Sequence, residues 1–237
     1  MTDPLAGDTV APAAQPATSS WEDALDIFYA PRAVFERRRD GTYLWPLLVL
    51  CVISTLVFLL SQQMNTALQD AEFARVMREN PMPAAEAKSA REMGEKFSAF
   101  SVYLIPVFTA IGAWLGGLIL MGIGKLMGAK LNFAQATVIT VLAAMPELLG
   151  RTIVGVQSLF MDIGTVQHRY SMSLNAARFL PGDANKWLLK FAALADPFVI
   201  WGVVLIGMGA YIIGRMEKEK AAVLAIVVAL VSTILFR

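Results

Sequence analysis

Three ionisable residues lie in otherwise apolar stretches of this sequence, and their types and spacing could support chemistry. Glu147 and Arg151 are four residues apart, which places them on one face of a helix, one turn from each other. Asp196 interrupts another apolar stretch. Two carboxylates around one arginine leave an excess negative charge, so one carboxyl could hold a proton. The group is either a buried ion network that fixes helix packing or a site for a proton, an ion or a headgroup.

Five apolar stretches must position these residues, and each is long enough or nearly long enough to cross a bilayer. They are continuous runs without the alternation of a membrane barrel, and only helices or closed barrels satisfy backbone polar groups in lipid. A composition of 57% hydrophobic and 16% charged residues agrees with a membrane location. We predict an all-α polytopic membrane protein, a bundle of five transmembrane helices at residues 43–60, 100–123, 133–161, 187–214 and 221–236.

The depth of the three ionisable residues follows from the helical rise. Counting about 1.5 Å per residue from the ends of the third and fourth stretches places Glu147, Arg151 and Asp196 roughly 20 to 25 Å above the inner edge. An unpaired ionisable group is costly in lipid. We therefore expect the three to share one level, turned from lipid, with Arg151 within salt-bridge reach of at least one carboxylate.

Prolines and glycines in the apolar stretches indicate helix packing. Pro146 and Pro197 each adjoin one of the ionisable residues, and a proline removes a backbone hydrogen bond and bends a helix. Gly112 and Gly116 form a GxxxG pair, which is typical of close helix contact within a subunit or between copies. We assign these four residues to helix packing.

An amphipathic segment, residues 19–40, precedes the first stretch. Trp21 and Phe28 fall on one face of a short helix that must end before Pro31. A second short helix offers Phe35 to an apolar surface and leads to consecutive arginines. We predict that this lead-in lies on the cytoplasmic leaflet with its arginines facing anionic headgroups; the alternative is packing against the protein's own helices. The residues assigned to the membrane surface or a partner are Trp21, Phe28, Pro31, Phe35, Arg37, Arg38 and Arg39.

The N-terminal residues and the basic flanks predict the orientation. Residues 1–18 lack a basic region followed by an apolar core, so we expect a disordered cytoplasmic tail rather than a secretory signal. Basic residues lie close to the spans on the N-terminal side and are diluted over two longer loops on the other side. We therefore place the N-terminus inside and the C-terminus outside, with residues 41–237 as the five-helix transmembrane domain.

Signatures of soluble enzymes are missing from the sequence. It contains no P-loop, HExxH, CxxC or nucleophile elbow, and one histidine with one cysteine, Cys51, cannot build a conventional zinc site. We therefore expect no enzymatic activity, no cofactor and no metal. The net charge of +1 argues against nucleic-acid binding. The partners we expect are the lipid bilayer and, as further candidates, other membrane proteins or a second copy.

A combination of residues along positions 20–236 points to a known family. These residues are Pro31, Val34 and Phe35 in the lead-in, Pro146 in the third span, and Asp196, Pro197, Phe198 and Trp201 in the fourth. With five spans, this pattern resembles the YIP family, the Ypt/Rab-interacting membrane proteins, in its bacterial branch. Eukaryotic members are associated with Rab GTPases and vesicle traffic. The short tail of this chain departs from the eukaryotic pattern and favours a bacterial inner (cytoplasmic) membrane.

Two functions remain open at this point. The first is a non-enzymatic scaffold, adaptor or membrane-organising protein that acts through the lead-in and its helix faces. The second is a small transporter, channel or lipid-handling protein built around Glu147, Arg151 and Asp196. The first predicts sensitivity to changes in the lead-in, and the second predicts sensitivity to changes in the three ionisable residues with the fold kept.

The five-span topology predicts that the two ends of the last apolar stretch lie on opposite sides of the membrane. Reporter fusions placed after Glu219 and at Arg237 should therefore report opposite compartments. Two fusions that report the same side would contradict this topology.

Overall fold

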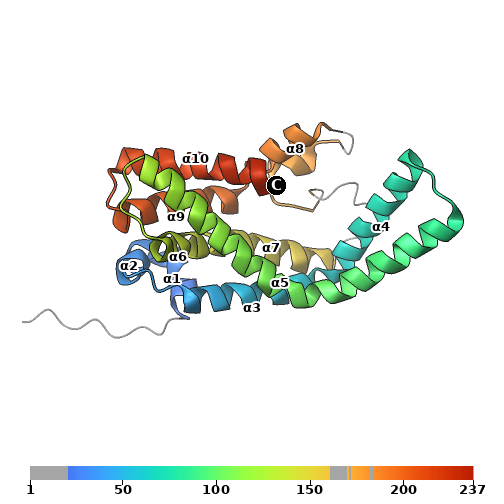
Figure 1. Ribbon diagram of the computed structural model, residues 1–237, viewed down its shortest axis with the longest axis horizontal. Helices are drawn as coiled ribbons and strands as arrows, with labels where there is room; N and C mark the ends of the chain where they lie inside the picture. Colours follow the sequence, from blue (N-terminus) through green and yellow to red (C-terminus); the bar gives the residue numbers. More distant parts are fainter. Residues whose placement is uncertain (1–20, 161–169, 171, 182–183, 237) are drawn as a thin grey trace, which may run out of the picture.

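The computed structural model describes residues 21–160, 170, 172–181 and 184–236, and every regular element in these ranges is a helix (Figure 1). This confirms the all-helical architecture for the described part; the tail predicted at residues 1–18 lies outside it. The α-helices are α1 (Asp23–Tyr29), α2 (Pro31–Arg37), α3 (Leu44–Leu60), α4 (Gln62–Glu79), α5 (Ala84–Leu126), α6 (Phe133–Ala143), α7 (Met145–Ser158), α8 (Lys186–Ala192), α9 (Pro197–Ile212) and α10 (Lys218–Phe236), with a 3₁₀ turn, η2 (Ala176–Phe179), before α8.

Two of the predicted spans are each divided into two helices. The third comprises α6 and α7, which meet at Ala144, because Pro146 in the first turn of α7 supplies no N–H to the preceding turn. A Cβ on Gly202 of α9 would lie only 2.8 Å from the carbonyl oxygen of Ala143, so α9 packs directly against this break. The fourth comprises α8 and α9, and the latter begins at Pro197.

By length and composition, two helical segments in the described residues could cross a membrane: Ala84–Leu126, and Phe133–Ser158 with its break. A third is added if α3 and the start of α4, bent by 61° at Ser61, count as one span. The described helices therefore support two or three spans on these criteria, where the sequence predicts five.

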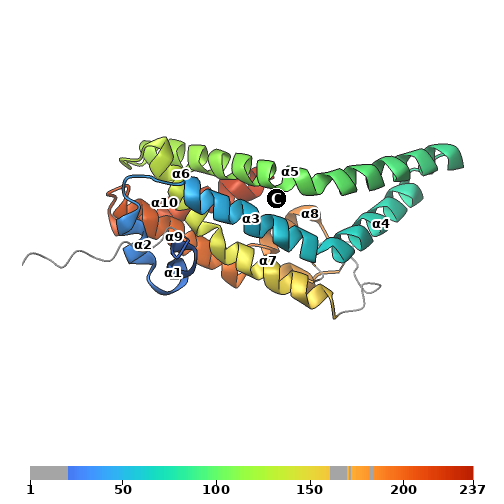
Figure 2. The same ribbon diagram turned by 90° about the horizontal axis from the view of Figure 1, so that it is seen from below.

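The region between the first two predicted spans is helical along most of its length. After Ser61 the chain turns into α4, then breaks at Asn80–Pro83, where Pro81 and Pro83 disfavour a helix. The 43-residue α5 then returns and runs without interruption into the bundle. Both figures show α4 and the first half of α5 extending past the other helices, at the end opposite α1 and α2 (Figures 1 and 2).

The centre of the bundle is α6, which buries residues on every side. Val138, Ile139 and Leu142 are fully buried, and α6 contacts α5, α9 and α3. Leu120 of α5 and Leu205 of α9 complete this core and are equally inaccessible. The threonine hydroxyls of α6 donate to carbonyls of the same helix, so the buried face carries satisfied polar groups.

The closest approach of α5 to α6 occurs at Gly117. A Cβ there would lie 2.5 Å from Thr137 Oγ1 and 3.0 Å from Thr137 Cα, whereas one on Gly116 would lie 3.3 Å from Thr140 Cγ2. Nothing lies within 4 Å of the position of a Cβ on Gly112. Of the GxxxG pair, only Gly116 borders the α5–α6 contact, and Gly112 faces open space.

A methyl group at Gly117 should separate α5 from α6. Gly117→Ala should lower the thermal unfolding midpoint in detergent, because overpacking a tight contact costs about 1 to 3 kcal/mol. Gly122→Ala is the matched control on α5, since a Cβ there meets nothing within 4 Å. It should leave the midpoint unchanged or raise it, because alanine favours the helix over glycine by about 1 kcal/mol. Equal midpoints for the two variants would show that the α5–α6 contact at Gly117 does not limit the thermal stability of the protein.

Candidate functional site

The lead-in helices α1 and α2 fold back on each other at Ala30–Pro31 and dock at one end of the bundle (Figure 1). Their inner side is apolar: Ile27, Val34 and Phe35 are fully buried. The ring of Phe28 meets Trp201 of α9 edge-on, with centroids 5.6 Å apart. Phe35 is predicted at the membrane surface but lies inside the protein. For this residue the alternative holds, in which the lead-in packs against the protein's own helices. The reason is that the apolar Phe35 side chain packs against α9 at Gly209.

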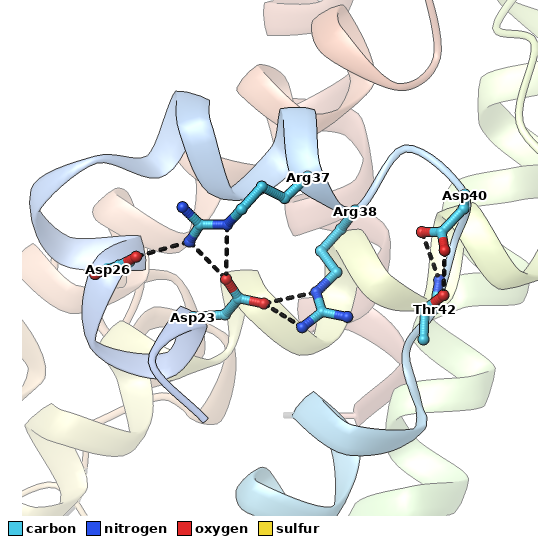
Figure 3. Close-up of polar contacts among 6 residues, drawn as sticks. All are labelled: Asp23, Asp26, Arg37, Arg38, Asp40 and Thr42. Atoms are coloured by element: carbon cyan, nitrogen blue, oxygen red, sulfur yellow. Dashed lines mark hydrogen bonds and ion pairs between the residues drawn. The ribbon is translucent and has the colours of Figure 1, made fainter. Parts of the chain in front are cut away.

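A buried carboxylate holds α1 and α2 together (Figure 3). The side chain of Asp23 is 2% exposed and lies between two guanidinium groups. Arg37 Nη2 donates to Asp23 Oδ1 at 2.6 Å, and Arg38 Nε donates to Oδ2 at 2.6 Å. Arg37 Nη2 also donates to Asp26 Oδ2 at 2.7 Å. A buried charge is costly unless it is paired and hydrogen-bonded, and here each oxygen of Asp23 has a charged donor.

This network determines which arginines remain at the surface. Burial alone would lower the pKa of Arg37, but hydrogen bonds to Asp23 and Asp26 outweigh it, and the pKa is raised. Arg37 therefore stays charged, and two cations balance two anions. Arg37 and Arg38, both predicted to face headgroups, point inward onto Asp23 instead, whereas Arg39 is exposed.

The chain between α2 and α3 is fixed across the start of α6. Gln135 Nε2 donates to the carbonyl oxygen of Arg39 at 2.8 Å. Gly41 has a φ of +85°, and a Cβ there would lie 2.8 Å from the backbone nitrogen of Gln135, so both its conformation and its surroundings require glycine. Asp40 accepts from the hydroxyl and the N–H of Thr42, and these bonds lower the pKa of Asp40 (Figure 3).

The three ionisable residues predicted within the spans have different partners. Arg151 Nη2 donates to Glu147 Oε1 at 2.9 Å across one turn of α7. Asp196 caps the N-terminus of α9: its Oδ1 accepts from the N–H groups of Phe198 at 2.8 Å and Val199 at 3.4 Å. The Arg151 side chain is 69% exposed and that of Glu147 is 36% exposed. Arg151 lies in the middle of α7 and is turned outward, and its long side chain extends the charge away from the core.

A cavity of 660 Å³ brings all three residues together at the end of the bundle opposite the lead-in. It is bordered by α3, α4, α5, α7 and α9, and Glu147, Arg151 and Asp196 contribute to its wall. A second cavity of 430 Å³ shares Glu147 and Arg151 with the first and reaches between α5, α6, α9 and α10. The geometry therefore gives the ionisable residues a common space, although Arg151 and Asp196 have separate hydrogen-bond partners.

Sequence reasoning missed three residues that fix the lead-in. Asp23 lies in the first turn of α1, where the helix dipole alone could account for an acidic residue, but its partners Arg37 and Arg38 are 14 and 15 residues away. Gly41 and Gln135 belong to a contact between segments distant in the chain. A local signal existed only for Gln135, because Asn132 followed three residues later by Gln135 is a capping-box pattern, and the structure forms that box.

Comparisons with known proteins give one match. A family model described as Yip1 domain matches residues 25–236, which covers the lead-in from Leu25 and every helix from α2 to α10. No curated protein and no solved structure matches this chain.

The Asp23 network should stabilise the whole lead-in. Asp23→Asn leaves two partly buried guanidinium groups without their anion, so we expect a loss of about 3 kcal/mol in the free energy of unfolding. The measurement is the thermal midpoint of the full chain in detergent. Glu36→Gln is the matched control, because it breaks the exposed Arg32–Glu36 pair on the same α2 and should leave the midpoint unchanged. An unchanged midpoint for Asp23→Asn would show that the network contributes nothing.

Proposed function

The chain belongs to the Yip1 domain family, and we propose that it acts as a non-enzymatic scaffold or adaptor that organises the bilayer around it. Membership in this family and the apolar helices support an integral membrane protein in a lipid bilayer. The scaffold role is the function that the lead-in supports best, because this element is fixed to the bundle and still presents an apolar surface.

One observation carries this proposal: the outward side of α1 and of the turn before it exposes large apolar and aromatic side chains. Trp21 is 54% exposed, Leu25 is 55% exposed and Tyr29 is 87% exposed, while the inward side carries the fully buried Ile27 and the paired Asp23. Tryptophan and tyrosine are enriched at membrane–water interfaces. A surface that is held rigid before it binds loses little conformational entropy on binding. We propose that Trp21, Leu25 and Tyr29 lie in the headgroup layer of the cytoplasmic leaflet.

The proposed orientation has the lead-in end of the bundle in the cytoplasm of a bacterial cell, with the spans in the inner membrane. The connections α5–α6 and α9–α10 lie at the same end as α1 and α2 (Figure 1). Lys130 and Arg215 lie in these connections, and Lys125 and Lys218 lie in the adjoining turns of α5 and α10. Basic residues favour the cytoplasmic side. Five spans, with α6–α7 and α8–α9 as broken ones, remain our proposal for the topology.

A second candidate function is favoured by the cavities beside Glu147 and Arg151. A small transporter, channel or lipid-handling protein requires an accessible space with polar groups, and the joined cavities offer one. A flux assay in proteoliposomes separates transport from a scaffold role. Flux through the unchanged protein that is lost in the Arg151→Gln variant would favour transport. Absence of flux in both the unchanged protein and the variant would favour the scaffold role or lipid handling.

Spin labels can test whether the outward side of α1 meets the bilayer. In a Cys51→Ser background, a nitroxide at Leu25→Cys in proteoliposomes should be accessible to oxygen and shielded from a water-soluble nickel complex. A label at Arg32→Cys, on the exposed polar side of α2, is the matched control and should show aqueous accessibility. Aqueous accessibility at both positions would contradict contact between the lead-in and the leaflet.

A further inference from the structure

We propose that the two joined cavities bind one phospholipid with an amine headgroup, the headgroup at Glu147, Arg151 and Asp196 and an acyl chain in the inner cavity. This inference rests on the second candidate function and is independent of the scaffold role. We call the 660 Å³ space the outer cavity and the 430 Å³ space the inner cavity.

The inner cavity is shaped for an apolar chain. Most of its wall is formed by small and aliphatic residues, among them Gly112 and Ala113 of α5, Val203 and Ile206 of α9, and Val228 of α10. Hydroxyl residues also line it, and two of them, Thr140 and Thr233, donate to carbonyl oxygens of their own helices. Gly112 faces this space, which explains why no atom lies within 4 Å of its Cβ position. Its missing side chain makes room here and does not bring two helices into contact.

The outer cavity is amphipathic. Phe58, Ile105 and Phe108 supply an apolar part of its wall, and Asn65 of α4 and Ser173 supply polar groups. A phospholipid needs this combination where its glycerol region and its headgroup begin, because both apolar and hydrogen-bonding surface must be matched. A free ion would need only the polar part.

The charges lie where the two cavities meet. Glu147 and Arg151 border both spaces, and Asp196 borders the outer one. One nitrogen of the Arg151 guanidinium contacts Glu147, and the side chain remains 69% exposed, so its planar fork is accessible to a phosphate. Among the described residues that line the two cavities, the charged ones are two carboxylates and one arginine, and this balance favours a headgroup that carries an ammonium group beside its phosphate.

The position along the helices fits a lipid. About 1.5 Å per residue places Glu147 and Arg151 roughly 20 to 27 Å from the start of α6, close to the far edge of hydrocarbon about 30 Å thick. A phosphate at that level lies where lipid phosphates end the hydrocarbon layer. The inner cavity extends from there toward the middle of the bundle, along the direction of an acyl chain.

The headgroup half of the site is tested by titrating the full chain in detergent with micelle-dispersed phosphatidylethanolamine and measuring the apparent Kd. Arg151→Gln should raise the Kd about tenfold or more, because a charge-assisted hydrogen bond to phosphate is lost. Arg91→Gln is the matched control: Arg91 pairs with Glu95 across one helical turn, as Arg151 pairs with Glu147, but lies on the extended half of α5. This control should leave the Kd unchanged.

The acyl-chain half is tested by filling the inner cavity. Gly112→Leu should raise the Kd about tenfold, because the new side chain occupies the space of the acyl chain. Gly122→Leu is the matched control on α5, since a Cβ there also meets no atom within 4 Å and Gly122 does not border the cavity. An unchanged thermal midpoint for each variant shows that the fold is kept.

Three ligands separate the possible sources of binding. O-phosphoethanolamine, which has no acyl chain, and diacylglycerol, which has no headgroup, should each bind at least tenfold more weakly than phosphatidylethanolamine. Equal binding of O-phosphoethanolamine would overturn the lipid assignment in favour of a soluble amine phosphate. Phosphatidylglycerol that binds as tightly would overturn the amine headgroup. If none of the cavity variants changed the lipid affinity, the lipid would be bound only at the outer surface of the protein.

None of these results affects the spin label at Leu25, so failure of this inference and failure of the scaffold proposal are distinguishable.

Discussion

A carboxylate that water hardly reaches is the interaction on which the lead-in end of this protein depends. Asp23 is 2% exposed, and Arg37 and Arg38 both donate to it, so the buried carboxylate has the paired donors that its burial requires. Those arginines reach it only when α2 lies against α1, and this same arrangement presses Phe35 into the core beside α9. One ionic contact therefore fixes the angle of the two helices, buries their apolar side and leaves their aromatic side facing out.

Local sequence signals predicted the helices, whereas contacts between segments distant in the chain could not be predicted from the sequence. The prolines at 31, 81 and 83 mark helix boundaries in both the sequence and the structure. The Glu147–Arg151 pair follows from a spacing of four. The partners of Asp23 do not follow, because a first-turn acidic residue has a sufficient local explanation in the helix dipole. The role of Asp196 does have a local signal, because an aspartate directly before a proline that begins a helix is a capping pattern.

Glycine spacing in α5 shows why a small-residue pattern cannot distinguish contact from space. Gly117 lies against Thr137, and the absence of a side chain there allows two helices to touch. Gly112 borders a cavity, and the absence of a side chain there leaves space open. The contact is possible because Thr137 Oγ1 donates to the carbonyl oxygen of Phe133 at 2.8 Å, so the hydroxyl facing α5 has its hydrogen bond within α6. A glycine surface can then lie on it without leaving a polar atom unsatisfied.

The Asp23 network and the Glu147–Arg151 pair follow opposite energetic rules. At the lead-in, one fully buried carboxylate is paired with two partly buried arginines, and the charges are balanced, which is the condition under which an ionic group contributes to a specific fold. At the other end, Arg151 pairs with Glu147 on a largely exposed side chain, and such pairs contribute little to stability. Placing these charges in an apolar helix still has a cost, because the surroundings solvate them less well than water does. That cost is lowest where polar groups can reach the charges, and both Glu147 and Arg151 border the 660 Å³ cavity.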